Sequence, residues 1–97
     1  MLVLITYDVS VTTTGGSRRL RNIAKTCLDY GIRVQNSVFE CEVNPAQFVM
    51  LKNSLIEIFD PNEDSLRFYF LGKKGHQKIE HIGIKAVQDP LRSPLIL

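Results

Sequence analysis

The stretch Leu2-Val3-Leu4-Ile5-Thr6-Tyr7-Asp8-Val9 decides the fold, because it is short, mostly apolar or β-branched, and free of glycine and proline. Such a run favours a strand buried on both faces over a helix, and we expect it to be the central strand of a sheet. A lone buried carboxylate is costly, so Asp8 should be paired, bound to a metal, or at a strand end that reaches solvent. The loop-like residues 10–16 that follow favour the strand end. The simpler alternative is an aspartate that begins a turn.

Length and composition predict one small soluble domain. The chain has 97 residues, of which 44% are hydrophobic and 23% charged, and no apolar run is long enough to cross a membrane. A core of this size would gain from oligomerisation, so we expect a dimer. Cys27 and Cys41 lack metal-site or redox spacing and are predicted to be small buried apolar residues. Together with the lack of a basic leader, this predicts a cytoplasmic protein.

Charge is segregated along the chain. Basic residues predominate in residues 15–35, acidic residues in 36–66, and lysines in 72–85. This pattern predicts a basic face and an acidic face, and a basic face on a small protein points first to phosphates. The alternative is an ordinary solvated helix face.

A first helix is predicted after the glycine-containing loop. Its apolar stripe consists of Leu20, Ile23, Ala24, Cys27 and Leu28. Ser17 or Gly16 is expected to cap its start, and Gly31 to take the left-handed position just past its end. The strand, loop and helix start together resemble a phosphate cradle, although the motif of a Walker loop is missing.

The middle of the chain predicts two strands and a second helix. Residues 32–43 are rich in strand formers, and Gln35-Asn36-Ser37 should split them at a turn or bulge. Asn44, Pro45 and Gln47 form the signature of a capped helix start. The buried stripe of that helix is Phe48, Leu51, Leu55, Ile58 and Phe59, and the helix should end at Asp60-Pro61.

Two more strands are predicted over residues 66–71 and 79–84, joined by a basic, mobile loop over 72–77. Up to residue 71 the order of elements is βαββαβ, which is typical of an α+β ferredoxin-like fold with an antiparallel sheet and both helices on one face. We expect this domain to cover residues 1–85. Residues 86–97, which end in three aliphatic side chains, should form an extra C-terminal strand or arm on a second subunit. A second copy would also cover the open sheet face.

Motifs for catalysis are sparse. Asp8 has no acidic or histidine neighbour along its own strand, and His76 and His81 are expected to be surface or edge residues. A two-fold dimer would change this count, because two Asp8 carboxylates could meet near the axis. Mg²⁺ needs only one or two carboxylates in addition to waters and phosphate oxygens.

The residues now described resemble a known family. Residues 4–9 (Leu-Ile-Thr-Tyr-Asp-Val), the arginines of the first helix, and above all residues 33–40 (Arg-Val-Gln-Asn-Ser-Val-Phe-Glu) are similar to the small CRISPR-associated adaptation proteins of the Cas2 family. The similarity extends over about residues 1–85. It implies a ferredoxin-like homodimer with the sheets face to face, which joins copies of a partner integrase during spacer acquisition.

The same resemblance implies a Mg²⁺- or Mn²⁺-dependent endonuclease acting on RNA or double-stranded DNA. Asp8 from both subunits would be the catalytic residue and the metal ligand. The implied nucleic-acid-binding residues are Arg18, Arg19, Arg21, Arg33, Ser37 and Phe39. A non-catalytic DNA-bridging scaffold is the alternative. An RNA-recognition module on the same fold is less favoured, because residues 66–71 lack the required glycine and aromatic pattern.

Overall fold

The computed structural model describes residues 1–72 and 77–84. In chain order the elements are β1 (Leu2–Asp8), α1 (Gly16–Leu28), β2 (Gly31–Gln35), β3 (Val38–Glu42), α2 (Pro45–Ile58), β4 (Ser65–Leu71) and β5 (Gln77–Gly83). The strands form one sheet in the order β2-β3-β1-β4-β5. Neighbouring strands are antiparallel throughout. The predicted ferredoxin-like α+β fold is confirmed, with β1 at the centre and β5 added at one edge.

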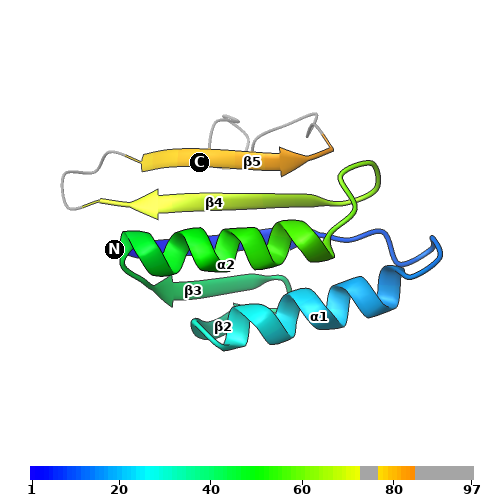
Figure 1. Ribbon diagram of the computed structural model, residues 1–97, viewed down its shortest axis with the longest axis horizontal. Coiled ribbons are helices and arrows are strands. Elements are labelled where there is room, and N and C mark those ends of the chain that lie inside the picture. The colour runs from blue at the N-terminus through cyan, green and yellow to red at the C-terminus, as the bar shows by residue number, and fades with distance from the viewer. Residues whose placement is uncertain (73–76, 85–97) are drawn as a thin grey trace.

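The molecule has two layers, since α1 and α2 lie on the same side of the sheet (Figure 1). The register of β1 places Val3, Ile5 and Tyr7 toward the helices, where all three are buried. Their partners on the flanking strands lie on the same face, with Ile5 opposite both Phe39 and Phe68. The core therefore fills the space between the sheet and the two helices.

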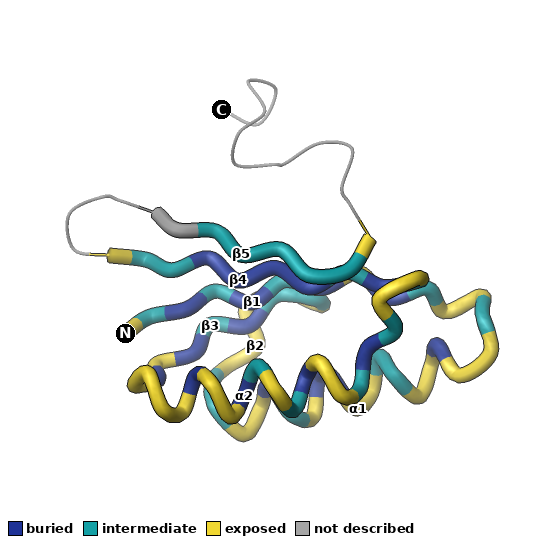
Figure 2. The backbone as a smooth tube through the Cα atoms, turned by 45° about the horizontal axis from the view of Figure 1, so that its top comes forward, coloured by how far each residue is buried: buried dark blue, intermediate teal, exposed yellow. Residues whose placement is uncertain are grey.

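The other face of the sheet carries no helix. Leu2, Leu4 and Thr6 of β1 point to this face and are only partly buried. Figure 2 shows the difference along the tube, where buried and partly buried residues alternate in β1. The prediction of a strand buried on both faces is thus correct for the helix side only, because a single chain has nothing to cover the other side.

The ends of the helices follow their sequence signals unequally. Asn44 and Gln47 form the predicted capping box of α2, with the side chain of Asn44 accepting from the Gln47 backbone N–H. The predicted N-cap of α1 was wrong: the cap is Gly15, at a φ of 82°, and no side chain caps the helix.

The predicted role of Gly31 was also wrong. Helix α1 ends at Leu28 with Asp29 as C-cap, and Gly31 is already the first residue of β2. Its glycine is required by packing instead, because a Cβ there would lie 2.2 Å from the carbonyl oxygen of Glu40. The terminal position of Leu28 also explains why this predicted core residue is 54% exposed.

Several sequence-based predictions fall partly or wholly outside the described residues. The loop over 73–76, His76 and the C-terminal arm over 86–97 belong to this group. The boundary of the domain at residue 85 is likewise still a prediction. Within the described part of the chain, neither helix has the length and apolar character to span a membrane.

The two cysteines occupy the core, as predicted. Cys27 of α1 and Cys41 of β3 are both fully buried free thiols. Burial raises the pKa of Cys27 to about 12, with a smaller contribution from the nearby Cys41. Both side chains therefore act as small apolar residues between helix and sheet.

Candidate nucleic-acid interface and metal ligand

The first feature of the site is the carboxylate that ends the central strand. Asp8 is the last residue of β1, is exposed, and lies opposite Ser65 of β4. Because side chains alternate along a strand, Asp8 lies on the same face as Leu4 and Thr6, which is the face without helices. Its predicted position, where the end of the strand meets solvent, is confirmed.

A second carboxylate lies beside this strand end. Asp64 is completely buried. Its Oδ1 accepts the backbone N–H of Ser10 at 3.1 Å, and its Oδ2 accepts the backbone N–H of Asp60 at 2.9 Å. The guanidinium of Arg19 adds a bond from Nε to Oδ2 at 2.7 Å and a bond from Nη2 to Oδ1 at 3.2 Å. Both oxygens of Asp64 are therefore satisfied by groups of the protein.

Arg19 fastens the loop that follows β1. Its Nη1 donates to the carbonyl of Thr14 at 3.1 Å, and its Nη2 donates to Oγ1 of Thr13 at 3.1 Å. A longer bond of 3.4 Å joins Nη2 to the carbonyl of Ser10. The guanidinium thus joins this loop to the connection between α2 and β4, which gives it an architectural role. Its predicted contact with nucleic acid stays a prediction.

The ion pair shifts the pKa values of both partners. Burial alone would raise the pKa of Asp64, but the hydrogen bonds from Arg19, Asp60 and Ser10 and the charge of Arg19 outweigh it, so the pKa is lowered. The hydrogen bond to Asp64 is the main cause that raises the pKa of Arg19. Both groups are therefore ionised at neutral pH, and the contact persists as a full salt bridge.

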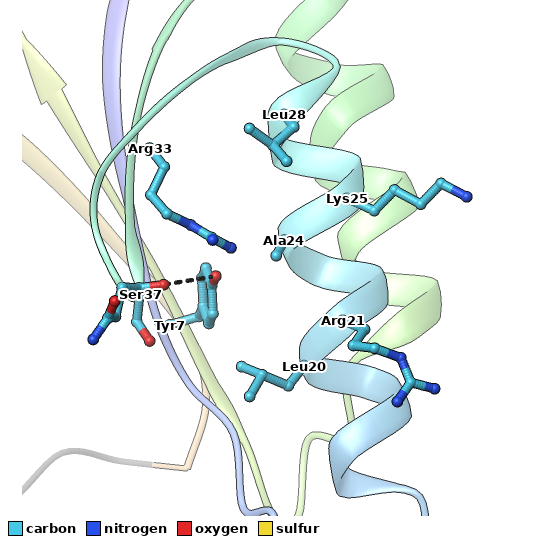
Figure 3. Close-up of a pocket in the computed structure, with 9 residues that line it drawn as sticks. Tyr7, Leu20, Arg21, Ala24, Lys25, Leu28, Arg33 and Ser37 are labelled. Carbon is cyan, nitrogen blue, oxygen red and sulfur yellow. Dashed lines mark hydrogen bonds between the residues drawn. The ribbon is translucent and has the colours of Figure 1, made fainter.

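A cavity of about 650 Å³ opens between α1 and the hairpin formed by β2 and β3. Its lining combines apolar, polar and cationic side chains: Tyr7, Leu20, Arg21, Ala24, Lys25, Leu28, Arg33, Asn36 and Ser37. In Figure 3, Leu20, Ala24 and Leu28 point from the helix toward Tyr7, and Arg33 reaches in from the strand. The ends of Arg21 and Lys25 extend along the outer side of the helix. The cavity therefore has an apolar wall, a cation inside and two cations at its rim.

Arg33 rests on an aromatic floor. Its guanidinium carbon lies 5.1 Å from the centroid of the Phe39 ring, and the rings of Phe39 and Tyr7 stack with centroids 6.1 Å apart. The hydroxyl of Tyr7 donates to the carbonyl oxygen of Asn36 at 3.3 Å (Figure 3). Burial raises the pKa of Tyr7, although a hydrogen bond with Arg33 opposes this. The contact with the Phe39 ring holds the Arg33 guanidinium at the cavity.

The residues predicted from the sequence fall into two groups. Arg21, Arg33 and Ser37 line the cavity, with Phe39 beneath Arg33. Arg18 is exposed on α1 outside the lining residues. Asp8 lies across the sheet from the cavity, because Tyr7 faces the helices and the next residue of a strand faces the opposite side. One chain therefore does not bring the cationic residues and Asp8 into one site.

Three contributors were missed from the sequence. Tyr7 and Lys25 line the cavity, and Asp64 holds the strand end. Tyr7 was assigned to the strand alone, although a tyrosine usually brings its hydroxyl to a partner when buried. Asp64 carried no signal, because its partner Arg19 is 45 residues away in the chain.

The helix-free face carries one more polar group beside the strand end. Arg67 of β4 is 9% exposed and donates from Nε to Nδ1 of His81 at 3.2 Å. Its Nη1 donates to the hydroxyl of Tyr69 at 3.3 Å. His81 is partly buried and lies on the edge strand β5, which confirms its prediction as a surface or edge residue.

Potential metal ligands are few in the described part of the chain. Within residues 1–72 and 77–84, no three side chains of histidine, cysteine, aspartate or glutamate form a group that could hold a metal ion. Asp8 offers a single exposed carboxylate, which can supply one or two oxygen ligands. A complete site would need further ligands from a second chain, from water, or from a bound phosphate.

Comparison with known proteins identifies the family. The family model described as CRISPR associated protein Cas2 matches residues 1–79. A relative from Nitratidesulfovibrio vulgaris, named CRISPR-associated endoribonuclease Cas2, is 58% identical over 100% of this chain and 94% of its own length. A relative from Halalkalibacterium halodurans, named CRISPR-associated endonuclease Cas2, is 54% identical over 99% of both.

A solved structure agrees with this result. The crystal structure of Streptococcus pyogenes Cas2 at pH 6.5 is similar to this chain with a TM-score of 0.70 and 60% sequence identity. The similarity covers 75% of this chain and 88% of that one. The sequence motifs, the sheet order and these matches agree, and the chain belongs to the CRISPR-associated Cas2 family.

Proposed function

We propose that the protein is a metal-dependent endonuclease of CRISPR adaptation that cleaves phosphodiester bonds in RNA or double-stranded DNA as a homodimer. The observation that carries the proposal is Asp8, an exposed carboxylate at the end of the central strand whose side chain forms no hydrogen bond or ion pair with residues 1–72 or 77–84. Asp64, by contrast, accepts hydrogen bonds from the protein at both of its oxygens. The names of the two relatives, an endoribonuclease and an endonuclease, support phosphodiester cleavage and leave both substrates in the proposal.

The helix-free face supports the dimer. Leu2 and Leu4 of the central strand and Leu71 and Ile79 of the flanking strands are all partly buried and lie on that face by register. These apolar side chains would leave water if a second copy covered the helix-free face, which would stabilise a dimer. An axis passing near the end of β1 would bring two Asp8 carboxylates together.

The donor set fits Mg²⁺ or Mn²⁺ under this condition. Hard cations take oxygen ligands, and Mg²⁺ commonly uses one or two carboxylates and completes its shell with water and phosphate oxygens. Asp8 from each subunit would hold the ion. When bound, the ion would supply an activated water and neutralise charge on the scissile phosphate.

The other residues act on binding and on position. Arg33, Arg21 and Lys25 would attract the phosphate backbone, and Arg33 is already oriented by its contact with Phe39. Arg19 and Asp64 would fix the loop that begins two residues after Asp8. The carboxylate would thereby be presented from a rigid strand end, which favours metal binding.

A second candidate function is a non-catalytic scaffold that bridges DNA for a partner integrase during spacer acquisition. The separation of the cavity from Asp8 favours it, since DNA could bind the cationic side chains without reaching the carboxylate. In that case the chain would contribute shape and charge to the complex. Binding would then be steeply dependent on salt, with a slope of about −0.9 in log affinity against log salt for each phosphate contacted.

Asp8→Asn tests the nuclease, with Asp29→Asn as the matched control because Asp29 is also an exposed aspartate. Rigorously purified proteins are assayed on RNA and duplex DNA with and without Mg²⁺ or Mn²⁺. We expect Asp8→Asn to abolish metal-stimulated cleavage and Asp29→Asn to retain it. Full cleavage by Asp8→Asn contradicts the metal site, and integration supported by that variant together with the integrase favours the scaffold.

Light scattering tests the dimer that the metal site requires. A dimer at micromolar concentration is the expected result. A monomer would remove the basis for the shared Asp8 site. Deletion of Leu95, Ile96 and Leu97, which lie outside the described residues, measures whether the predicted arm contributes to the dimer.

A further inference from the structure

The cavity between α1 and the β2–β3 hairpin has a volume and an apolar lining that phosphate binding does not require. A cationic patch that only tracks a backbone can be flat, yet here an open hollow of about 650 Å³ is lined on one side by the apolar side chains of Leu20, Ala24 and Leu28. That volume is within the range of about 300–1,000 Å³ typical of pockets for small ligands. The ligand should therefore have an apolar, flat part in addition to its charge.

Charge complementarity defines the rest of the ligand. Arg21 and Lys25 are one turn apart on α1, and like charges at this spacing repel. Arg33 approaches from the opposite wall (Figure 3). Among the residues that the structure describes, none of these three cations pairs with a carboxylate. An anion is the partner that they lack.

The polar groups of the cavity are suited to the edge of a base. Asn36 and Ser37 lie at the tip of the hairpin and offer amide and hydroxyl groups next to the apolar wall. Bases are recognised in single strands by stacking on flat side chains and by hydrogen bonds to their edges. The guanidinium of Arg33, whose central carbon lies 5.1 Å from the centroid of the Phe39 ring, is planar and can stack on a base.

We propose that this cavity binds one unpaired nucleotide of a nucleic-acid strand, such as the first residue of a single-stranded overhang beside a duplex. The base would lie against Leu28 and Tyr7 beside Arg33, and the strand would continue over α1 toward the charged ends of Arg21 and Lys25. This deepens the proposed function and rests on it, because it names the form of nucleic acid that binds these cations. It does not depend on Asp8, which lies across the sheet.

Leu28→Ser tests the cavity, with Val49→Ser as its control. The two side chains are 54% and 55% exposed, but only Leu28 lines the cavity, so the control reproduces the loss of an exposed apolar helix residue. Binding of a labelled duplex with a short single-stranded overhang is compared with binding of the same duplex with blunt ends, by fluorescence anisotropy. Thermal unfolding of both variants verifies that they fold.

We expect the overhang to tighten binding to the wild-type protein by about tenfold, the effect of one stacked base. Leu28→Ser should remove most of this gain, measured as the ratio of the affinities for the two duplexes, and Val49→Ser should keep it. A nucleoside monophosphate should compete for the overhang more strongly than inorganic phosphate at equal concentration. Equal competition by the two would overturn the proposal, because the cavity would then be a phosphate site only.

The experiment distinguishes failure of the cavity proposal from failure of the proposed function. If both duplexes bind with equal affinity and Asp8→Asn still abolishes cleavage, the cavity proposal is wrong and the proposed function stands. If neither duplex binds, the cavity proposal is wrong, and the cleavage assay of Asp8→Asn on RNA decides separately whether the proposed function stands. An overhang preference that Leu28→Ser leaves intact also overturns the cavity as its source.

Discussion

Two carboxylates lie at neighbouring positions of the same sheet and have opposite surroundings. Asp8 ends β1 opposite Ser65, the residue that follows Asp64 in the chain. Asp8 is exposed on the helix-free face, whereas Asp64 is completely buried and accepts bonds from Arg19 and two backbone N–H groups. The comparison shows how one end of the sheet combines a carboxylate that holds the fold with another that is exposed to solvent.

The two carboxylates differ in their surroundings and therefore in their effect on stability. Asp64 supplies acceptors for loop N–H groups that would otherwise be buried without partners, so its charge stabilises the junction. Asp8 meets solvent, where an unpaired charge has little energetic penalty. Variants at the two positions should therefore affect stability very differently, and the effects can be ranked.

The largest effect is expected for Asp64→Ala. The change removes the acceptor for the backbone N–H groups of Ser10 and Asp60 and leaves Arg19 without its partner, which is expected to destabilise the fold by about 3–5 kcal/mol. Urea unfolding followed by circular dichroism measures this. Glu63→Ala, at the neighbouring acidic residue, is the control, and an equal loss in both variants would contradict the special role of Asp64.

Gly83→Ala should destabilise the same junction by a smaller amount. Gly83 has a φ of 103°, and a Cβ there would lie 2.2 Å from the carbonyl oxygen of Asp64. A strained backbone of this kind costs about 1–3 kcal/mol. Gly15→Ala is the matched control, since Gly15 has a φ of 82° but its added Cβ would meet only the end of Arg19 at 3.5 Å. Equal unfolding free energies for the two variants would show that the close approach to Asp64 is unimportant.

Acid should weaken the junction without any mutation. The folded-state pKa of Asp64 is below its ordinary value of 3.8, so its contribution to stability is fully present above the unfolded pKa. That contribution is lost as the pH falls through the lower, folded pKa. Unfolding free energies measured from neutral pH down through 3.8, the ordinary pKa of the carboxyl, follow the onset of this loss. In Asp64→Asn this part of the acid dependence should be missing, and an unchanged acid profile in that variant would contradict the assignment.

The smallest effect on stability is expected for Asp8→Asn. An exposed surface substitution usually changes the free energy of unfolding by less than about 0.5 kcal/mol. In a dimer with two facing carboxylates, the change could even stabilise the assembly when metal is absent, because the charges no longer repel. Thermal unfolding with and without Mg²⁺ distinguishes these effects. A loss comparable to that of Asp64→Ala would mean that Asp8 is structural as well.

The sequence predicted the elements of the fold because their signals are local. The apolar run of β1, the strand-forming residues of β3, the capping box at Asn44 and the polar turn at residues 35–37 all depend on neighbours within a few positions. The start and end of α1 were predicted less well. The N-cap is Gly15, which lies next to the predicted Gly16, and no local pattern distinguishes the two. Gly31 is required by its close packing against Glu40, which is distant in the sequence.

The candidate site was predicted in its residue types but not in its arrangement. Asp8, Arg33 and Ser37 were named from the sequence as site residues. The structure places Asp8 on one face of the sheet and the cavity on the other, because successive residues of a strand, here Tyr7 and Asp8, point to opposite faces. The pairing of Arg19 with Asp64 joins residues 45 positions apart, and no local pattern indicates it. Long-range pairs of this kind are decided by the folded chain, because several segments must meet before the bond can form.

The buried thiol of Cys27 allows the separation of α1 from the core to be measured as a labelling rate. With a pKa raised to about 12, it carries almost no thiolate at neutral pH, and its full burial between α1 and the sheet blocks reagents as well. Alkylation can therefore proceed only in molecules whose α1 has separated from the core. The rate of labelling by iodoacetamide would measure how often that separation occurs, and ligands that bind between α1 and the hairpin should slow it.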